Sequence, residues 1–293
     1  MINVIKSPYV EKKQAGTLPN LIIIGAMKCG TTSLHHYLNS HPEISMSREK
    51  ELDFFRSKKR WARGVEWYKS HFVGEAKIYG ESSPNYTNYP YWAGVPEKMY
   101  SLIPQAKLIY ILRDPIERII SHYIHQYTAG KENRSIDEAL ADFQDNPYIM
   151  RSSYYYQLEQ YLKYFPEENI LVITLENLSN NPQSTLTKVA NFLNLQPEFN
   201  FERASKTLHS SVFKRRKNEW GELLSKNSLF KKIKKLPPEI RYHLEKVVYF
   251  PLSEPVSRPN LNQELREKIN DYLQKDINCL RSYTGDLFES WSL

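Results

Sequence analysis

The stretch that decides the fold reads Leu21-Ile22-Ile23-Ile24-Gly25-Ala26-Met27-Lys28-Cys29-Gly30-Thr31-Thr32-Ser33. Its first four residues form an apolar run without polar alternation, which is typical of a strand that is buried on both faces. The run leads into a loop bounded by Gly25 and Gly30, and three hydroxyl residues then open a helix. Glycines allow backbone N–H groups to approach phosphate oxygens, and the start of a helix presents its positive end to an anion. The stretch therefore predicts a loop that binds a phosphate group.

This loop differs from the nucleotide-binding motif G-x-x-x-x-G-K-[ST] in the place of its lysine. The motif has its lysine directly after the second glycine, where this chain has Thr31. The only lysine of the loop, Lys28, lies inside it. We therefore expect an anionic ligand, and ATP with magnesium is not the favoured one.

Short apolar runs of the same kind recur along the chain and alternate with helical patterns. We expect buried parallel strands at 21–24, 78–80, 108–112 and 170–174. Helix starts are indicated by Asp114-Pro115, by the capping box of Ser135 to Glu138 and by Asn181-Pro182, and a final helix is expected from about 262 to 281. The pattern predicts an α/β fold with a central parallel sheet flanked by helices.

The chain of 293 residues contains no repeat and no flexible linker, so we expect a single domain over residues 20–293 after an N-terminal extension, 1–19. Residues 203–260 are polar and less regular, and we expect them to form a basic cap region. Nine basic and two acidic residues lie between 214 and 235, which accounts for the whole net charge of +7. Such a segment suits an anionic cofactor or a polyanionic partner, although an ordinary solvated helix face is the alternative.

The cysteines and the N-terminus limit the cellular setting. Cys29 and Cys279 are the only cysteines, so we expect neither a structural disulfide nor a cysteine-rich zinc site. The first twenty residues contain no apolar stretch of signal-peptide length, and no transmembrane segment is expected. We therefore expect a cytoplasmic location.

A second motif reads Leu112-Arg113-Asp114-Pro115-Ile116-Glu117-Arg118-Ile119-Ile120-Ser121. Arg113 follows a predicted strand, at the end where open parallel sheets bind ligands. Ser121 falls two helical turns later on roughly the same face, so the two side chains can bind a second phosphate. The alternative is an Arg–Asp pair that only caps the helix.

Together these two segments resemble the sulfotransferases that use 3′-phosphoadenosine 5′-phosphosulfate (PAPS). In that family a loop [GA]-x-x-K-[CSTG]-G-[ST]-[ST] binds the 5′-phosphosulfate, and an element L-R-[DN]-P-x-x-R-x-x-S binds the 3′-phosphate. The residues that the resemblance assigns to these two sites are Lys28, Cys29, Gly30, Thr31, Thr32 and Ser33 on the 5′ side and Arg113 and Ser121 on the 3′ side. It also implies a P-loop-like sheet, no metal, and adenosine 3′,5′-bisphosphate (PAP) as the co-product.

A third motif, Arg48-Glu49-Lys50-Glu51-Leu52-Asp53-Phe54-Phe55, is followed by Gly64-Val65-Glu66-Trp67-Tyr68. It resembles the heparan-type branch of the family, in which E-x-x-F-F supplies a catalytic glutamate, and this implies that Glu51 is the general base. A positioned carboxylate that accepts the proton of an alcohol is typically worth about 10²- to 10⁴-fold in rate. Glu49 and Asp53 remain alternatives, as does a charged turn before two core phenylalanines.

The segment Gly80-Glu81-Ser82-Ser83-Pro84-Asn85-Tyr86 resembles the E-K-[ST]-P-x-Y motif of that branch, but Ser82 stands where the motif often has lysine. Either Lys28 alone supplies the charge there, or a residue of the basic stretch 214–235 replaces the lysine. In the family a later basic loop closes the nucleotide site. Residues 212–217 match it by position and charge, with Lys214 and Arg215 as the predicted contacts and Arg216 and Lys217 as alternatives.

Histidine serves as the base in some members of the superfamily, so His122, His125 and His209 are further candidates for the base. His122 and His125 lie three residues apart on the helix after Arg113, where packing in the core is the favoured interpretation.

The sequence thus predicts a PAPS-dependent sulfotransferase in which Glu51 is the base and Lys28 stabilises the charge that grows on the leaving phosphate. The acceptor is expected to carry a hydroxyl group and to be a small metabolite, a lipid or glycolipid, or a saccharide, and an anionic acceptor would suit the basic stretch. No nucleic acid partner is expected. A nucleoside or small-molecule kinase with a degenerate P-loop is the alternative, and a non-catalytic protein that binds an anionic polymer through 214–235 is the second.

Overall fold

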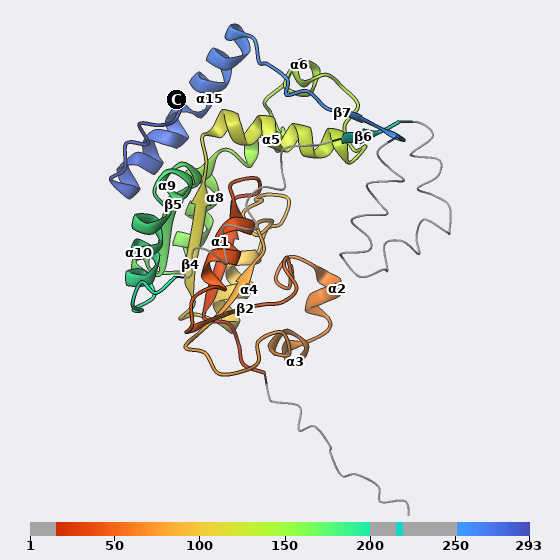
Figure 1. Ribbon diagram of the computed structural model, residues 1–293. Coiled ribbons are helices and arrows are strands. Elements are labelled where there is room, and N and C mark those ends of the chain that lie inside the picture. Colours follow the sequence, from red (N-terminus) through yellow and green to blue (C-terminus); the bar gives the residue numbers. More distant parts are fainter. Residues whose placement is uncertain (1–15, 200–214, 219–250) are drawn as a thin grey trace, which may run out of the picture.

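The computed structural model describes residues 16–199, 215–218 and 251–293 (Figure 1). In chain order the strands and helices of these residues are β1 (Leu21–Gly25), α1 (Thr31–Leu38), β2 (Ile44–Met46), α2 (Lys58–Trp61), α3 (Val65–Lys69), β3 (Ile78–Ser82), α4 (Val95–Leu102), β4 (Lys107–Leu112), α5 (Pro115–Thr128), α6 (Ile136–Ala139), α7 (Pro147–Met150), α8 (Tyr154–Leu162), a 3₁₀ turn (Glu167–Asn169), β5 (Ile170–Thr174), α9 (Leu175–Asn180), α10 (Pro182–Phe192), β6 (Arg215–Lys217), β7 (Ser253–Pro255) and α15 (Gln263–Thr284).

The first five strands form one sheet in the order β2-β3-β1-β4-β5, and every neighbouring pair is parallel. The four strands predicted from the sequence are confirmed as β1, β3, β4 and β5. The sequence analysis missed β2, which has only three residues and a polar Ser45 between two apolar side chains. The predicted α/β fold, a single domain with a central parallel sheet flanked by helices, is confirmed.

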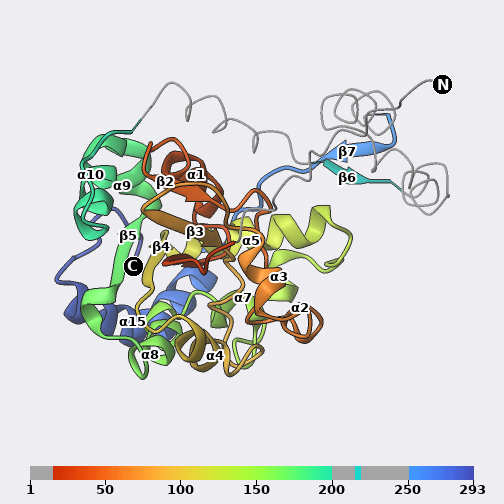
Figure 2. The ribbon, with the colours of Figure 1, turned by 90° about the horizontal axis from the view of Figure 1, so that it is seen from below.

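Successive residues of β1 face opposite sides of the sheet, because side chains alternate along a strand. Leu21 and Ile23 pack in a core with α1, α9 and α10. Ile22 and Ile24 pack in a second core with α4, α5, α8 and α15. Helices therefore cover both faces of the sheet, as Figures 1 and 2 show. This explains why the strands read as continuous apolar runs.

The helix starts indicated by the sequence are confirmed by their caps. Asp114 Oδ1 accepts a hydrogen bond of 2.9 Å from the N–H of Glu117 at the start of α5. Ser135 and Glu138 form the predicted capping box of α6, and Asn181 caps α10. Asn262 caps the final helix, which continues to Thr284 and ends at Gly285 with a φ of 68°.

The central position of β1 decides where a ligand can bind. From β1 the chain continues to β2 and β3 on one side of the sheet and later to β4 and β5 on the other. Open parallel sheets bind ligands at the carboxyl ends of their strands, where the strand order reverses. The loop after β1 therefore lies between the end of β3 and the end of β4, which leads into Arg113.

A short antiparallel ribbon of β6 and β7 lies apart from the sheet, at the far end of α5 (Figure 1). The guanidinium carbon of Arg216 lies 4.0 Å from the ring centroid of Tyr127, which attaches the ribbon to α5. The sequence analysis predicted a less regular region there and did not anticipate the ribbon. Most of the predicted cap region 203–260, including Lys214 and His209, lies outside the described residues. The predicted domain limits stay a prediction.

Among the residues that the structure describes, no helix combines the length and the apolar composition that crossing a membrane requires.

Candidate functional site

The predicted phosphate loop connects β1 to α1. Gly30 precedes α1 with a φ of 86°, and a Cβ atom there would lie 2.5 Å from Cδ1 of Leu175, so both conformation and space require glycine. No side chain caps α1 at Gly30, and its first turn has no acidic residue. Because the first N–H groups of a helix have no acceptor within it, those of Thr31, Thr32 and Ser33 suit an anion.

Lys28 gives this loop its positive charge. Its φ of 73° is unusual for a residue other than glycine, and such strain is often stored at functional sites. Burial lowers the pKa of Lys28, the charges of Arg113 and Lys50 lower it further, and Glu51 acts in the opposite direction. Several cations therefore lie close to one another here, and an anion among them would relieve their repulsion.

Cys29 belongs to the loop only through its backbone. Its thiol is fully buried and lies 3.7 Å from the hydroxyl of Tyr154, and burial raises the pKa of the thiol to about 12. Its N–H donates to the carbonyl of Ala26 over 3.1 Å. The thiol thus packs in the core, and any contact of Cys29 with a ligand is limited to its main chain.

Arg113 lies just before α5, and Ser121 lies on this helix. Glu117 lies between them. Arg113 Nη2 donates to Glu117 Oε2 over 2.9 Å, and Ser121 follows Glu117 by one helical turn on the same face. Arg258 also donates to the Glu117 carboxylate. Burial alone would raise the pKa of Glu117, but the hydrogen bond and charge of Arg258, together with Arg113, lower it below its usual value. Arg113, Arg258 and the ionised Glu117 together carry one net positive charge.

Arg258 and Glu117 were missed by the sequence analysis. Arg258 is 141 positions from Glu117, and its surroundings contain no motif, so no local signal identifies it. Glu117 lies inside the second motif. Its spacing of four residues from Arg113 suits an ion pair and could have identified it.

Arg215, a predicted nucleotide contact, uses its guanidinium within the ribbon. Its Nε donates to Ser253 Oγ over 2.9 Å, and its Nη2 donates to the Ser253 carbonyl. A contact of Arg215 or Lys214 with a nucleotide stays a prediction, and Lys214 lies outside the described residues.

The segment that contains Glu51 crosses the carboxyl end of β3. The N–H of Glu51 donates to the carbonyl of Ser82 over 3.0 Å. Glu51 and Asp53 have φ angles of 61° and 52°, and Arg60 donates to the carbonyl of Glu51 over 2.8 Å. Left-handed residues other than glycine cost about 1–3 kcal/mol each and persist only where the surroundings enforce them. The conformation of this segment is therefore closely determined.

The three carboxylates of the segment have different partners. Glu49 pairs with Arg60 at 3.3 Å, and Asp53 pairs with Arg56. Glu51 lies 3.5 Å from Lys50 Nζ, which in turn lies 3.5 Å from Thr31 Oγ1. Among these carboxylates Glu51 is thus the one that a described contact links to the phosphate loop. The sequence analysis did not single out Lys50, since lysines in a charged turn are usually solvated.

Glu81, a residue of β3, has a structural environment. Its fully buried carboxylate accepts hydrogen bonds from Ser83 Oγ at 2.5 Å, from the Tyr86 hydroxyl at 2.6 Å and from the Tyr68 hydroxyl. Burial raises the pKa of Glu81. The carboxylate ties β3 to the segment after it and to α3, and Ser83 Oγ also accepts the N–H of Asp53 over 3.0 Å, which links this group to the Glu51 segment.

Of the two histidines of α5, His122 fits the packed interpretation, whereas for His125 that interpretation is wrong, because its side chain is exposed. His122 is buried, its ring centroid lies 4.7 Å from that of Tyr148, and burial strongly lowers its pKa. A neutral, enclosed imidazole of this kind suits a core position. His125 lies on the exposed side of the helix.

His35 on α1 predicts a pH-dependent stability. Burial, and then the charges of Lys50 and His36, lower the pKa of His35 to about 4 from 6.5. In the folded state His35 therefore stays neutral at pH values where it is protonated in the unfolded state. The free energy of unfolding consequently falls as the pH is lowered from 6.5 to about 4. One pKa unit corresponds to about 1.4 kcal/mol, so we expect a loss of about 3 kcal/mol through this residue.

The measurement is the free energy of unfolding in urea at pH 7 and pH 4.5 for the wild type, His35→Gln and, as a control, His125→Gln. We expect His35→Gln to lose less stability between the two pH values, whereas the control should follow the wild type. Equal losses for all three proteins would contradict the role of His35.

The C-terminal residues support the Arg113 element from behind. The N–H of Ser292 donates to Asp114 Oδ2 over 2.5 Å, and Glu176 accepts from the N–H of Asp114 over 3.0 Å. Trp291 Nε1 lies 3.4 Å from Glu176 Oε2. The start of α5 is thus fixed by groups from two other parts of the chain, Glu176 and the C-terminal residues.

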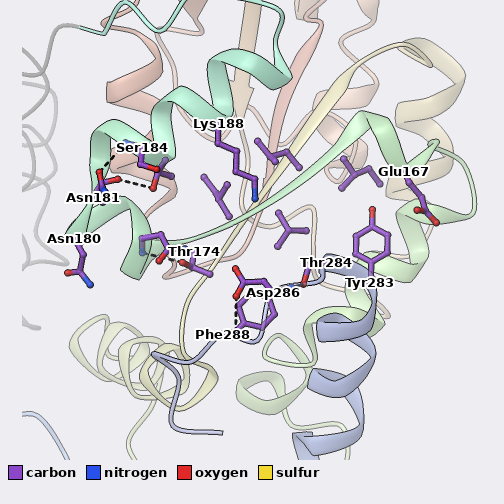
Figure 3. A pocket seen from close by; sticks show the side chains of 16 residues that line it. Glu167, Thr174, Asn180, Asn181, Ser184, Lys188, Tyr283, Thr284, Asp286 and Phe288 are labelled. Atoms are coloured by element: carbon purple, nitrogen blue, oxygen red, sulfur yellow. Dashed lines mark hydrogen bonds between the residues drawn. The ribbon is translucent and has the colours of Figure 1, made fainter.

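A cavity of about 540 Å³ lies along β5, between α10 and the residues that follow α15 (Figure 3). Lys188 and Asp286 point into it from opposite sides (Figure 3). None of the residues predicted for the site lines this cavity, so we assign the candidate site to the carboxyl ends of β1, β3 and β4 instead.

The family of the chain follows from its similarity to known proteins. The family model of the sulfotransferase domain matches residues 18–277. The membrane-associated sulfotransferase kil1 of Dictyostelium discoideum is 42% identical over 123 residues, which are 40% of this chain and 25% of that protein. Heparan sulfate glucosamine 3-O-sulfotransferase 5 of Mus musculus is 35% identical over 193 residues, with 61% of this chain and 54% of that protein covered.

Among solved structures, that of a sulfotransferase from Alicyclobacillus acidocaldarius covers 94% of this chain and 100% of that chain, with a TM-score of 0.67 and 23% identity, and it supports the fold. The chain spans about a quarter to a half of the length of the curated relatives above. Because the family model covers most of the chain, the resemblance seen in the motifs is confirmed: the chain belongs to the sulfotransferase domain family.

Proposed function

We propose that this chain is a PAPS-dependent sulfotransferase that transfers a sulfuryl group to an acceptor hydroxyl, with Glu51 as the general base. The observation that carries the proposal is the uncapped start of α1, where Lys50 Nζ lies 3.5 Å from Thr31 Oγ1 and 3.5 Å from Glu51 Oε1. The charges of Arg113 and Lys50 also act on Lys28 of the adjoining loop. Family membership supports sulfuryl transfer as the type of reaction.

The residues present fit a donor with phosphates at both ends. Lys28 and the first N–H groups of α1 suit the 5′-phosphosulfate, while Arg113 and Ser121 suit the 3′-phosphate. Arg118 behind them is fully buried, donates to Ser152 Oγ over 2.6 Å and has no hydrogen-bond partner for Nη1 among the described residues. Its charge adds to a positive field that an anionic donor would balance. The absence of a metal from the reaction stays a prediction.

In the proposed step, PAPS supplies the sulfuryl group and Glu51 accepts the proton of the acceptor hydroxyl. The acceptor oxygen forms a bond to sulfur as the bond between sulfur and the 5′-phosphate oxygen breaks, and the electron pair stays on that phosphate. Lys28 and the helix N–H groups stabilise this charge where it develops. PAP is then the co-product.

The residues around Trp92 and Arg151 support an anionic saccharide as the acceptor. Trp92, in the segment after β3, is 38% exposed, and the guanidinium carbon of Arg56 lies 4.7 Å from its ring centroid. Arg151 lies close by, with Nε 2.8 Å from Asn88 Oδ1 and Nη1 in contact with Met27 of the loop. An aromatic face with arginines suits a sugar ring with acidic groups. One relative is a heparan sulfate glucosamine 3-O-sulfotransferase, which agrees with this class.

In the part of the chain that the structure describes, no observation favours the kinase or the anionic-polymer binder over the sulfotransferase. The cytoplasmic location and the absence of a nucleic acid partner stay predictions, which cell fractionation and a binding assay with nucleic acids would check.

The proposed donor predicts a specific binding result. Isothermal titration with PAP is expected to show binding, and Arg113→Ala should weaken it about 10- to 100-fold, because a charge-assisted hydrogen bond is worth about 1.5–3 kcal/mol. Arg63→Ala is the matched control, since Arg63 stacks on Trp67 at 4.2 Å and lies outside the proposed site. A wild-type protein that binds ATP with magnesium but not PAP would overturn the proposal.

The acceptor is sought by mass spectrometry. The protein is incubated with PAPS and a panel of saccharides, lipids and small metabolites, and products heavier by one SO₃ group are identified. We expect products from acidic saccharides and none in the Arg113→Ala reaction at a low PAPS concentration.

A further inference from the structure

We propose that Lys50 is a second catalytic cation, which binds the sulfuryl oxygens of PAPS beside Lys28 and positions the Glu51 carboxylate. This inference rests on the proposed donor and base. It gives a role to a residue outside the predicted site residues.

Lys50 bridges two parts of the proposed site. Its Nζ lies 3.5 Å from Thr31 Oγ1 at the start of α1 and 3.5 Å from Glu51 Oε1. Its side chain is 22% exposed, so it lies largely inside the protein between these groups. Both distances are at the long end of hydrogen bonding, and the remaining N–H donors of the ammonium are suited to an anion between the loop and the base.

Ser82, at the carboxyl end of β3, leaves a place in the proposed site for a positive charge from another residue. In the related motif a lysine often stands where this chain has Ser82, whose side chain is fully buried and whose Oγ has no partner among the described residues. Ser82 therefore cannot supply charge to a ligand. The carbonyl of Ser82 accepts the N–H of Glu51, which places Lys50 and Glu51 against the end of β3. Lys50, on the segment that crosses the end of β3, thus supplies a positive charge that Ser82 cannot supply.

Lys50 acts electrostatically on the phosphate loop. Its charge contributes to the lowered pKa values of Lys28 and of His35 on α1. Burial also lowers the pKa of Lys50 itself, while Glu51 acts in the opposite direction. A partly desolvated ammonium interacts more strongly with an anion than one in water does. The sequence analysis offered Lys28 alone or the stretch 214–235 as the source of charge, and Lys50 is a third source.

In the transfer step Lys50 donates N–H groups to the sulfuryl oxygens and exchanges no proton. Its pairing with Glu51 holds the carboxylate beside the group to be transferred, which favours productive geometry. PAP lacks the sulfuryl group, so the contact of Lys50 distinguishes PAPS from PAP.

This distinction provides the test. The dissociation constants of PAPS and PAP are measured by isothermal titration for the wild type, Lys50→Met, Lys50→Arg and the control Lys69→Met, whose lysine pairs with Glu66 on α3. We expect Lys50→Met to weaken PAPS binding about 10- to 100-fold and PAP binding by less than about threefold. Lys50→Arg should keep PAPS binding within about fivefold of the wild type, because its charge is retained. Lys69→Met should bind both ligands like the wild type.

The outcomes separate this inference from the proposed function. If Lys50→Met weakens PAPS and PAP by the same factor, or changes neither, the role of Lys50 is wrong while the proposed donor stands. If the wild type binds neither compound, the proposed function fails and the role of Lys50 fails with it.

Discussion

Replacement of Glu51 by glutamine is expected to lower kcat about 10²- to 10⁴-fold with the acceptor found in the product search, because an amide cannot accept the hydroxyl proton. The substitution keeps the size and shape of the side chain, which is 47% exposed. PAP binding should therefore stay within about twofold of the wild type by titration, since a base that acts only in the transition state contributes little to ground-state binding. The rate is measured by following PAP formation.

Glu49→Gln is the matched control. Glu49 lies in the same segment, its side chain is 52% exposed, and it pairs with Arg60. We expect its kcat to stay within about threefold of the wild type, as is usual for an exposed ion pair. If Glu51→Gln retained most of its turnover while Glu49→Gln lost it, the assignment of the base would be wrong.

The second large effect concerns stability. Phe54→Ala is expected to lower the free energy of unfolding by about 3–5 kcal/mol, because it removes a large side chain from a closely packed site. Phe54 is 1% exposed, and its ring stacks on Tyr68 with centroids 4.2 Å apart and also contacts Trp61 and Trp67. The measurement is urea unfolding followed by tryptophan fluorescence and circular dichroism.

Leu287→Ala serves as the control, since its side chain is 64% exposed. Surface substitutions usually change stability by less than about 0.5 kcal/mol. Equal losses in the two variants would show that the aromatic cluster under the Glu51 segment contributes little. If Phe54→Ala folds, its rate at a temperature below its transition also reports whether the cluster holds Glu51 in place.

The motif E-x-x-F-F thus combines two interpretations that the sequence analysis kept apart. The phenylalanines are core residues, as the structural alternative predicted, and they anchor the turn that carries Glu51. Packing and the proposed chemistry are not exclusive here, because the left-handed backbone at Glu51 and Asp53 needs a rigid support.

Much of the fold was predictable because its signals are local. Apolar runs of four or five residues marked β1, β3, β4 and β5, and cap residues marked the starts of α5, α6 and α10. The strand β2 was not predictable, since three residues with a central serine form no recognisable run. Its place in the sheet depends on pairing with β3, which is a tertiary contact.

The candidate site divides in the same way. The sequence by itself determined the phosphate loop, the Arg113 element and the family, because glycine, proline and hydroxyl residues at fixed spacings report local backbone requirements. Only the tertiary structure placed Lys50 between Thr31 and Glu51, set Arg258 against Glu117, and turned the Cys29 thiol into the core. These contacts join residues up to 141 positions apart. Their energies depend on distance and burial, which no local pattern of residues encodes.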